Sequence, residues 1–215
     1  MSNVRPFDRA TVRPVILAGG GATRFGGGPK GLARVGGERI LDRLVAACVA
    51  AFGVEPILVA NDPAAHAWHP GLTVVPDVQP GAGALGGLLT AVTAGGGRPV
   101  VVVAWDMPFP PAGLLQALAA ELDRYDAVLP ASDGRRGVEP LLAAYAPRCL
   151  GPMTDALARG DRRAIAFHDA VKVGILPLDR VRAFGDPELL FFNVNTPDDL
   201  TRAEAAWRER GSARS

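Results

Sequence analysis

Short apolar runs alternate with longer segments of helical periodicity along most of the chain. Apolar runs between turn residues favour strands, which are therefore predicted at 15–18, 56–60, 72–75, 100–104, 127–129, 171–175 and 190–194. Apolar residues at helical spacing predict helices at 40–52, 86–94, 112–122, 153–158, 164–167 and 197–209. The run 141–145 fits either element. This alternation predicts an α/β fold with a largely parallel sheet covered by helices.

Two segments show these patterns most clearly. The run 100–104 is apolar at every position, which predicts a strand buried on both faces. In the helix predicted at 40–52, apolar residues recur three and four positions apart, and Gly53 follows as a stop signal. Both segments are therefore expected to contribute to a packed core.

Composition and charge narrow the class of protein. Of 215 residues, 48% are apolar and 21% charged, which predicts a single folded domain spanning 1–215, with 1–11 and 211–215 as flexible tails. The net charge of +1 gives no electrostatic basis for binding nucleic acid or a membrane. No secretory signal or membrane-spanning run is recognised, so a cytoplasmic protein is expected. Cys48 and Cys149 lie in apolar stretches and are expected to be buried thiols.

The glycine-rich loop after the first predicted strand carries the most information about chemistry. Its sequence, LAGGGATRFGGGPK from Leu17 onward, contains the cations Arg24 and Lys30. Glycine lets backbone N–H groups approach a phosphate chain, and the cations can neutralise the α-phosphate and a departing pyrophosphate. A Walker-type loop is excluded because Gly31 follows Lys30, and the bare GxGxxG at 26–31 has no strand running directly into it. The remaining alternative is a flexible surface loop.

Asp106 lies just beyond the buried run 100–104. In open α/β sheets, ligands bind at the carboxyl ends of the strands, where both Asp106 and the glycine loop are expected. A carboxylate in that place can hold Mg²⁺ against phosphate oxygens. The alternative is a turn or helix-capping residue ahead of Pro108.

Other polar residues follow the second and third predicted strands. Asn61 and Asp62 follow one and Asp77 follows the other, so each is suited to contact a base or ribose, or equally to form an ordinary turn. The small residues at 83–87 open a helix, where the backbone can lie against a nucleotide or pack closely on the sheet.

The histidines favour structural positions over a metal site. His66 and His69 flank Trp68 without a third soft ligand nearby, so a solvated loop is predicted there. His168 is predicted to lie on the surface of a helix.

The loop and Asp106, together with Arg162-Arg163 and the segment Asn193-Val194-Asn195-Thr196-Pro197, resemble the molybdenum cofactor guanylyltransferase family over about 12–207. The resemblance implies a three-layer, Rossmann-like nucleotidyltransferase domain with a mostly parallel central sheet. It further implies that GMP passes from Mg²⁺-bound GTP to the phosphate of molybdopterin or molybdenum cofactor, with release of pyrophosphate. Transient contacts with cofactor-biosynthesis or acceptor proteins are also expected.

The resemblance assigns roles to particular residues. The family's nucleotide contacts fall on Leu17, Ala18, Gly19, Lys30, Asn61 and Asp77. The predicted nucleotide site is completed by Asp106, by Gly20 in the glycine-rich loop and by Gly86 in the run of small residues at 83–87. Arg24, Lys30 and Asp106 are expected to be catalytic, with Asp106 as the metal ligand. The acceptor is expected to contact Arg162, Arg163, Asn193 and Asn195.

The sequence departs from the family pattern at four places near these motifs. Pro29 stands where the family usually has Asp, and Phe25 where Met is typical. Trp105 disturbs the usual frame of small residues around the metal-binding Asp, and Glu139 replaces a frequent His. The phosphate and metal chemistry is expected to survive these changes.

The chemistry of a phosphate acceptor agrees with the residues available. A phosphate monoester has its second pKa near ~6 and is already largely dianionic at pH 7, so positioning matters more than a protein base. Several alternatives stay open: the same transfer with CTP or to another acceptor such as a sugar phosphate, an NAD(P)-binding oxidoreductase, and a non-catalytic nucleotide-binding regulator.

Overall fold

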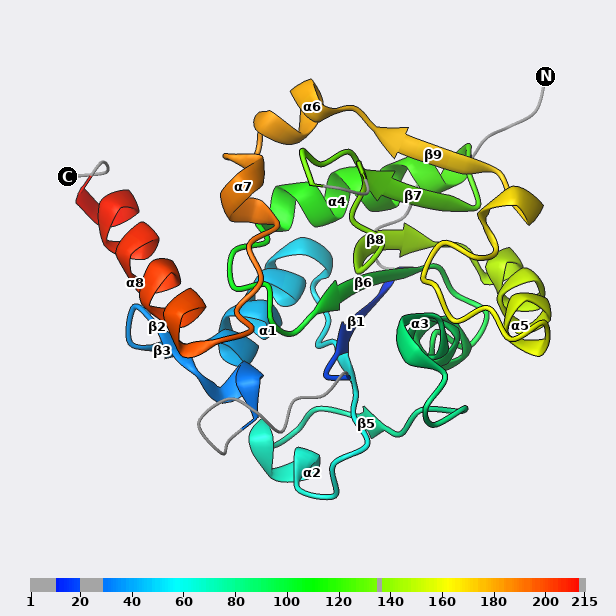
Figure 1. Ribbon diagram of the computed structural model, residues 1–215, viewed down its shortest axis with the longest axis horizontal. Coiled ribbons are helices and arrows are strands. Elements are labelled where there is room, and N and C mark those ends of the chain that lie inside the picture. The colour runs from blue at the N-terminus through cyan, green and yellow to red at the C-terminus, as the bar shows by residue number, and fades with distance from the viewer. Residues whose placement is uncertain (1–10, 20–28, 135–136, 213–215) are drawn as a thin grey trace.

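The computed structural model describes residues 11–19, 29–134 and 137–212, and its centre is a seven-stranded sheet (Figure 1). The strands lie in the order β5-β4-β1-β6-β8-β7-β9. Their bounds are β1 (Arg13–Leu17), β4 (Ile57–Val59), β5 (Val74–Val75), β6 (Val100–Ala104), β7 (Ala127–Pro130), β8 (Leu142–Tyr145) and β9 (Val173–Leu176). Only β8 runs antiparallel to its neighbours in this sheet, so the prediction of a mostly parallel sheet is confirmed.

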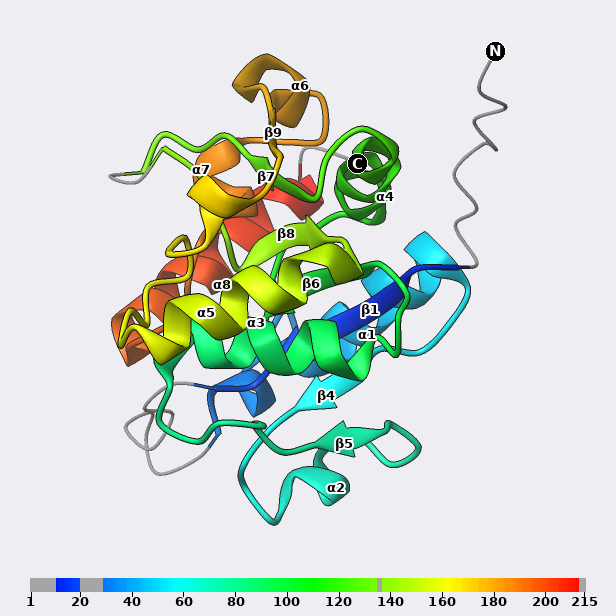
Figure 2. The same cartoon turned by 90° about the vertical axis from the view of Figure 1, so that its right-hand side faces the viewer.

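Helices cover both faces of the sheet and complete a three-layer α/β fold. The α-helices are α1 (Ile40–Phe52), α2 (Ala65–Trp68), α3 (Gly83–Ala94), α4 (Ala112–Ala120), α5 (Leu150–Ala158), α6 (Leu178–Arg182), α7 (Pro187–Leu190) and α8 (Pro197–Ser212). Figure 2 shows α3 and α5 side by side across one face, while α1 and α4 pack together on the other. None of the helices in the described ranges has the length and apolarity needed to cross a membrane.

Shorter elements connect these layers. The 3₁₀ helices are η3 (Lys30–Leu32), η4 (Glu121–Asp123), η5 (Pro147–Cys149) and η6 (His168–Ala170). A two-stranded hairpin, β2 (Arg34–Val35) and β3 (Glu38–Arg39), precedes α1 and was not predicted from the sequence.

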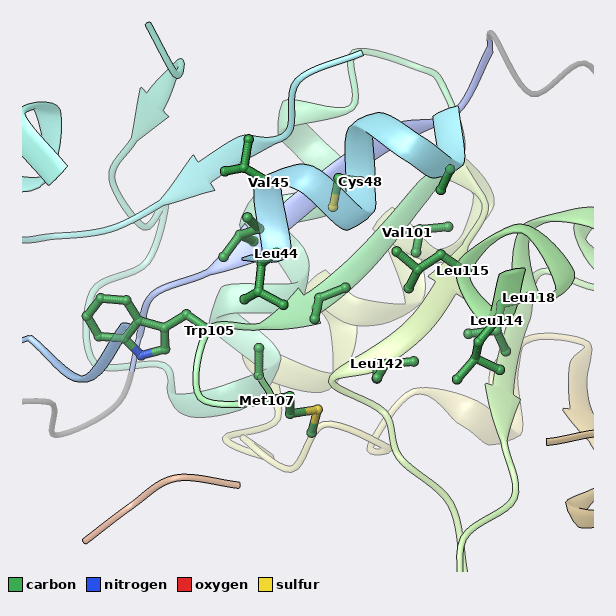
Figure 3. Close-up of a cluster of buried hydrophobic side chains, with 14 of the residues drawn as sticks. Leu44, Val45, Cys48, Val101, Trp105, Met107, Leu114, Leu115, Leu118 and Leu142 are labelled. Carbon is green, nitrogen blue, oxygen red and sulfur yellow. The ribbon is translucent and has the colours of Figure 1, made fainter. Parts of the chain in front are cut away.

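Alternate residues of β6 face opposite layers. Val101 and Val103 join the apolar cluster under α1 and α4, where Figure 3 shows Val101 together with side chains of both helices. Val100 and Val102 join the second cluster, under α3 and α5. Because successive strand residues point to opposite faces, an unbroken apolar run buries every position, and all of β6 is buried as predicted. Burial of each such side chain stabilises the fold by roughly 1.5–3 kcal/mol.

The topology places a crevice at the carboxyl ends of the central strands. Leu17 of β1 pairs with Val59 of β4 on one side and with Ala104 of β6 on the other, all three strands being parallel. The connection from β1 to β4 runs through α1 on one face, whereas α3 leads into β6 from the other face. The strand order therefore reverses between β1 and β6, which is where ligands bind in open α/β sheets.

The helix predicted at 40–52 is confirmed as α1. It ends at Gly53, which adopts a left-handed conformation with φ of 73° and donates its N–H to the Val49 carbonyl at 2.8 Å. This arrangement is a typical helix C-cap, and glycine adopts it without steric cost. The ambiguous run 141–145 forms strand β8.

The strand predicted at 190–194 is wrong. The chain instead forms α7, which begins at Pro187 and is capped by Asp186, whose carboxylate accepts the Glu188 N–H at 3.0 Å. The following residues then leave the sheet, and the Val194 N–H donates to the Asp106 carbonyl at 2.8 Å. An apolar run alone did not distinguish this buried, irregular segment from a strand.

The helix predicted at 164–167 is also wrong, because this segment forms turns that lead into η6. Phe167 is fully buried, whereas Ile165 is 38% exposed. Residues two positions apart do not share a helix face, so this pair never formed an amphipathic pattern.

The predicted tails are only partly described. Residues 1–10 and 213–215 lie outside the described ranges. At the other end of the described chain, α8 continues through Ser212, beyond the predicted limit at 210.

The contrast between Phe167 and Ile165 gives a test of the packing on the α3–α5 face. Phe167→Ala should lower the free energy of unfolding by about 3–5 kcal/mol, because it removes a large buried ring that packs on Tyr145. Ile165→Ala, in the same turn, should cost less than about 1 kcal/mol because this side chain is partly solvated. Chemical denaturation of both variants measures the difference, and equal losses would contradict the assignment of Phe167 to the core.

Candidate functional site

A pocket of about 420 Å³ opens at the carboxyl ends of β1, β4 and β6. Its wall includes six residues predicted from the sequence: Leu17, Gly19, Asn61, Asp77, Asp106 and Asn193. The glycine-rich start of α3 contributes Gly83, Ala84 and Gly87. The remaining lining residues were not predicted: Val59, Gly81, Ala104, Trp105 and Leu141. The pocket therefore lies at the crevice that the strand order defines.

Asn61 and Asp77 hold each other in place on one side of the pocket. The Asn61 side-chain amide donates to the Asp77 carboxylate at 2.7 Å, and the Asp77 backbone N–H donates to Asn61 Oδ1 at 2.8 Å. They follow β4 and β5, which are neighbours in the sheet, so the strand ends bring them together. The pair presents a carboxylate of fixed orientation to the pocket. Asp62 instead accepts the Ala64 N–H at 2.8 Å, which is an ordinary turn contact.

The glycines of α3 have two distinct roles. A Cβ on Gly87 would lie 3.6 Å from the Leu17 side chain, so this position combines close packing on β1 with a place in the pocket wall. A Cβ on Gly86 would lie 2.6 Å from the Cβ of Ala82, which makes Gly86 a packing glycine within the helix start. Ala18 likewise lies outside the lining set, because it is buried and donates its N–H to the Val59 carbonyl.

Asp106 lies in the pocket wall and is held there by its backbone. Its carbonyl accepts the Val194 N–H, and α4 begins only after Pro111, so Asp106 does not cap that helix. Its Oδ1 atom is buried and has no hydrogen-bond partner among the described residues. Burial raises the pKa of this carboxyl, and the nearby Lys30 ammonium opposes the rise. A buried acceptor of this kind is suited to a cation, which would satisfy the free oxygen.

Lys30 joins the N-terminal part of the site to the C-terminal part. It lies at the start of η3, and its Nζ donates to Asn195 Oδ1 at 2.7 Å. The segment that carries Asn195 is fixed by Asp199, whose carboxylate accepts the N–H groups of Asn195 and Thr196. The Thr196 hydroxyl in turn accepts the Asp199 N–H at 3.1 Å, which forms a reciprocal cap at the start of α8.

Arg162 and Arg163 occupy different environments. The Arg162 carbonyl accepts the Leu85 N–H at 3.3 Å, and a Cβ on Gly83 would lie 3.5 Å from Arg162, so this residue borders the pocket rim. Arg163 is 75% exposed and forms an ion pair with Asp161, and its hydrogen bond lowers the pKa of that carboxyl to about 2. Arg163 therefore already has a counter-charge in the protein, the carboxylate of Asp161.

Asn193 also belongs to the pocket wall. Its side-chain amide donates to the Phe191 carbonyl at 2.8 Å, which holds it beside the end of β6. Arg24 and Gly20 lie outside the described residues.

The histidines and cysteines lie apart from the pocket. His66 belongs to α2 and is exposed, His69 lies 3.0 Å from the Asp42 carboxylate, and His168 packs against Phe167 in η6 as a half-buried residue. The prediction that His66 is solvated is confirmed, although it lies on the short helix α2 and not in a loop. His168 is half-buried in a 3₁₀ helix, so its predicted place on a helix surface is corrected. No group of three metal-binding side chains occurs within the described ranges. Cys48 and Cys149 are buried as predicted, and burial raises the pKa of each thiol to about 12.

Comparison with known proteins identifies the family. The MobA-like NTP transferase domain matches residues 14–172, from β1 to the segment before β9. The chain belongs to the MobA-like NTP transferase family.

Relatives of this MobA-like chain match over most of their length. The probable molybdenum cofactor guanylyltransferase of Pelotomaculum thermopropionicum is 33% identical over 191 residues, covering 88% of this chain and 90% of that protein. The probable molybdenum cofactor guanylyltransferase of Chloroflexus aggregans is 37% identical over 198 residues, covering 89% and 92%. The crystal structure of molybdopterin-guanine dinucleotide biosynthesis protein A from Archaeoglobus fulgidus has a TM-score of 0.76 and 27% identity, covering 92% and 99%. The nucleotidyltransferase fold predicted from the sequence is therefore confirmed.

The pocket residues missed by the sequence analysis differ in how visible they were. Gly83, Ala84 and Gly87 were not missed, because they belong to the run of small residues at 83–87 that was expected to lie against a nucleotide or to pack on the sheet. Leu141 enters the pocket because β8 pairs antiparallel with β6, which no local pattern encodes. The sequence analysis noted Trp105 as a departure from the family pattern but assigned it no role in the site.

Asp106 Oδ1 has no partner in the described ranges, so this carboxylate is expected to lower the stability of the fold although the site needs it. Asp106→Asn should raise the free energy of unfolding in chelator-containing buffer by about 0.5–2 kcal/mol, because it removes a buried negative charge with an unsatisfied oxygen. Asp155→Asn, on the exposed face of α5, is the matched control and should stay within about 0.5 kcal/mol of wild type. A destabilised Asp106→Asn variant would show that the carboxylate has a structural partner.

Proposed function

We propose that this chain is a single-domain, cytoplasmic nucleotidyltransferase that moves GMP from GTP to the phosphate of molybdopterin or molybdenum cofactor. The products are the guanine dinucleotide form of the cofactor and pyrophosphate. The observation that carries this proposal is the pocket at the β1–β6 crevice, which combines a fixed polar pair, Asn61–Asp77, with the buried carboxylate of Asp106. The names of the related proteins support the same substrates.

The Asn61–Asp77 pair favours guanine over cytosine. Guanine presents two adjacent N–H donors, at N1 and N2, and a carboxylate can accept both. Cytosine presents an acceptor at N3 beside its amino group, and this acceptor would face a carboxylate unfavourably. Because Asn61 fixes the orientation of Asp77, the distinction is built in before the nucleotide binds.

The phosphate end of GTP is assigned to the other side of the pocket. Lys30 and Arg24 are the cations for the triphosphate, and Leu17, Gly19 and Gly20 supply the adjoining backbone. Asp106 is the residue that would hold Mg²⁺, which neutralises negative charge on the phosphate oxygens when bound. The buried Oδ1 atom, which has no partner in the described part of the chain, fits this role because a cation would satisfy it.

The reaction follows from this arrangement as an in-line substitution. An oxygen of the acceptor phosphate forms a bond to the α-phosphorus of GTP, and the bond from that phosphorus to the α,β-bridging oxygen breaks. Pyrophosphate leaves with the electron pair, and the acceptor gains a pyrophosphate link to GMP. The acceptor monoester is mostly dianionic near pH 7, since its second pKa is near ~6, so no protein base is required. The side chains supply orientation and charge neutralisation.

The acceptor is assigned to the pocket side nearest the C-terminal segment. Asn193 lies in the pocket wall, and Asn195 contacts the Lys30 ammonium. Arg162 borders the same opening beside Gly83. Guanidinium groups suit a phosphate monoester because their planar donors match two phosphate oxygens. Contacts with cofactor-biosynthesis or acceptor proteins would be transient.

The central test is pyrophosphate release by the purified chain supplied with Mg²⁺, GTP and molybdopterin. Wild type should release pyrophosphate with GTP and far less with CTP. Asp106→Asn and Lys30→Ala should each reduce kcat by about 100-fold or more, the usual cost of removing one preorganised charge contact from an active site. Arg24→Ala should show a loss of the same order.

Asp155→Asn serves as the control and should keep the wild-type rate. Equal rates with GTP and CTP would overturn the assignment of Asp77 to guanine. Release of pyrophosphate with a sugar phosphate but not with molybdopterin would show that the acceptor is a sugar phosphate. Near-normal turnover by Asp106→Asn at saturating Mg²⁺ would show that Asp106 is not the metal ligand.

A second test separates the acceptor from the nucleotide. Combining Arg162→Ala with Arg163→Ala should weaken molybdopterin binding by about tenfold or more, because charge-assisted hydrogen bonds to a phosphate are lost. GTP affinity, measured separately by calorimetry, should remain close to wild type. Since Arg163 is paired with Asp161, most of the loss should already appear in the Arg162→Ala variant. Loss of GTP affinity with intact acceptor binding would refute this division of roles.

A further inference from the structure

Two tryptophans and a glycine form a buried stack beside the pocket. The rings of Trp68 and Trp105 are stacked, with centroids 5.2 Å apart and an interplanar angle of 24°. Trp105 is 2% exposed and Trp68 7% exposed. Gly31, also buried, lies so close to the indole of Trp105 that a Cβ there would come within 2.4 Å of its Cε3 atom. Figure 3 shows Trp105 at the edge of the apolar cluster, just beyond the end of β6.

This stack lies between the two segments that carry the charged groups of the site. Gly31 directly follows Lys30 in η3, and Trp105 directly precedes Asp106. The Trp105 N–H donates to the Leu17 carbonyl at 3.1 Å, which ties the same residue to β1. The indole therefore acts as a spacer between the backbone of Lys30 and the backbone of Asp106. Trp68, from α2, packs on the indole and limits its movement.

We propose that Trp105 is a positioning residue of the transfer reaction, which sets the separation between Lys30 and Asp106 through its contact with Gly31. The inference rests on the proposed function, because it assigns Lys30 and Asp106 to the triphosphate end of the nucleotide. A misplacement of about 1 Å in an active site can cost about 100-fold in rate, so a rigid spacer at this point has a direct chemical consequence.

A substitution at Gly31 tests this role most directly. Its φ is not among the positive values found in the described chain, so its backbone conformation suits any residue. The three atoms nearest to a Cβ built there all belong to the Trp105 ring. Gly31→Ala should therefore be harmful when Trp105 is present and tolerated when the ring is made smaller. Such dependence between two substitutions measures their direct coupling.

The experiment is a double-mutant cycle on Gly31→Ala and Trp105→Phe, read by pyrophosphate release. Gly31→Ala alone should lower kcat by about 100-fold while KM for GTP changes much less, because the contacts of the base and ribose lie elsewhere in the pocket. Trp105→Phe alone should cause a smaller loss. The double variant should regain most of the activity of Trp105→Phe, because the smaller ring lacks the Cε3 atom that lies nearest to the added methyl group. Losses in kcat that simply multiply would overturn the proposal.

Trp207→Phe is the matched control. Trp207 packs on Gly36, and its ring centroid lies 3.8 Å from the Arg43 guanidinium carbon. It does not belong to the pocket lining, so this variant should keep the wild-type kcat. Thermal unfolding of every variant accompanies the kinetics. A lower Tm for Gly31→Ala together with an unchanged kcat would reduce the stack to a purely structural role and reject the positioning role.

A binding measurement separates this inference from the proposed function. Calorimetry with GTP and with GMP, each with Mg²⁺, gives the affinity gained from the β- and γ-phosphates. In Gly31→Ala this gain should fall by up to about tenfold, well below the loss in kcat, with GMP affinity little changed, since charged hydrogen bonds to phosphate are displaced. A wild-type chain that does not bind GTP would defeat the proposed function itself. A wild-type chain that binds GTP normally, beside a Gly31→Ala variant with an undiminished gain, would defeat the role of Trp105 alone.

Discussion

The site depends on the parallel register of three central strands. Because β1 is hydrogen-bonded in parallel to both β4 and β6, Leu17 lies between Val59 and Ala104 at a single edge of the sheet. The residues that follow these strands are thereby gathered at one place, although they are up to about ninety positions apart in the sequence. The pairing itself is maintained by the apolar clusters on both faces, and neither cluster includes a residue that the chemistry needs to be charged. The core can therefore be fully apolar while the edge remains polar.

The elements that could be predicted are those whose burial is uniform along their length. β6 is buried at every position, and α1 has a continuous buried stripe with a glycine cap, so local pattern and tertiary environment agree. The failures occur where an apolar run is buried without regular structure. Phe191 and Val194 are as buried as strand residues, yet they belong to an irregular segment whose hydrogen bonds go to Asp106 and to the start of α8. The Asp186-Pro187 pair was a usable signal for a helix start.

The candidate site was predictable to the extent that a strand end determines position. Asn61, Asp77 and Asp106 were found by this rule, and the structure places all three in the wall of one pocket. Contacts that depend on turn geometry were not predictable. The ion pair between Arg163 and Asp161 joins residues two positions apart through a turn, and the link from Lys30 to Asn195 spans most of the chain. The sequence showed a suitable cation and amide, but only the fold brings them within hydrogen-bonding distance.

The C-terminal segment lies outside the matched family domain, yet its residues form hydrogen bonds to Lys30 and Asp106 inside that domain. That domain ends at residue 172, whereas the Val194 N–H binds the Asp106 carbonyl and the Asn195 side chain accepts from Lys30. Asp199 anchors the same segment through the cap of α8, so the helix fixes the position of Asn195. Lys30 is thus held from two directions, by the Asn195 amide at its ammonium and by the Trp105–Gly31 contact at its backbone. A buried carboxylate oxygen of Asp106 with no partner among the described residues and a cation held at both ends form a preorganised electrostatic arrangement, whose cost in stability is offset by the packing of the sheet.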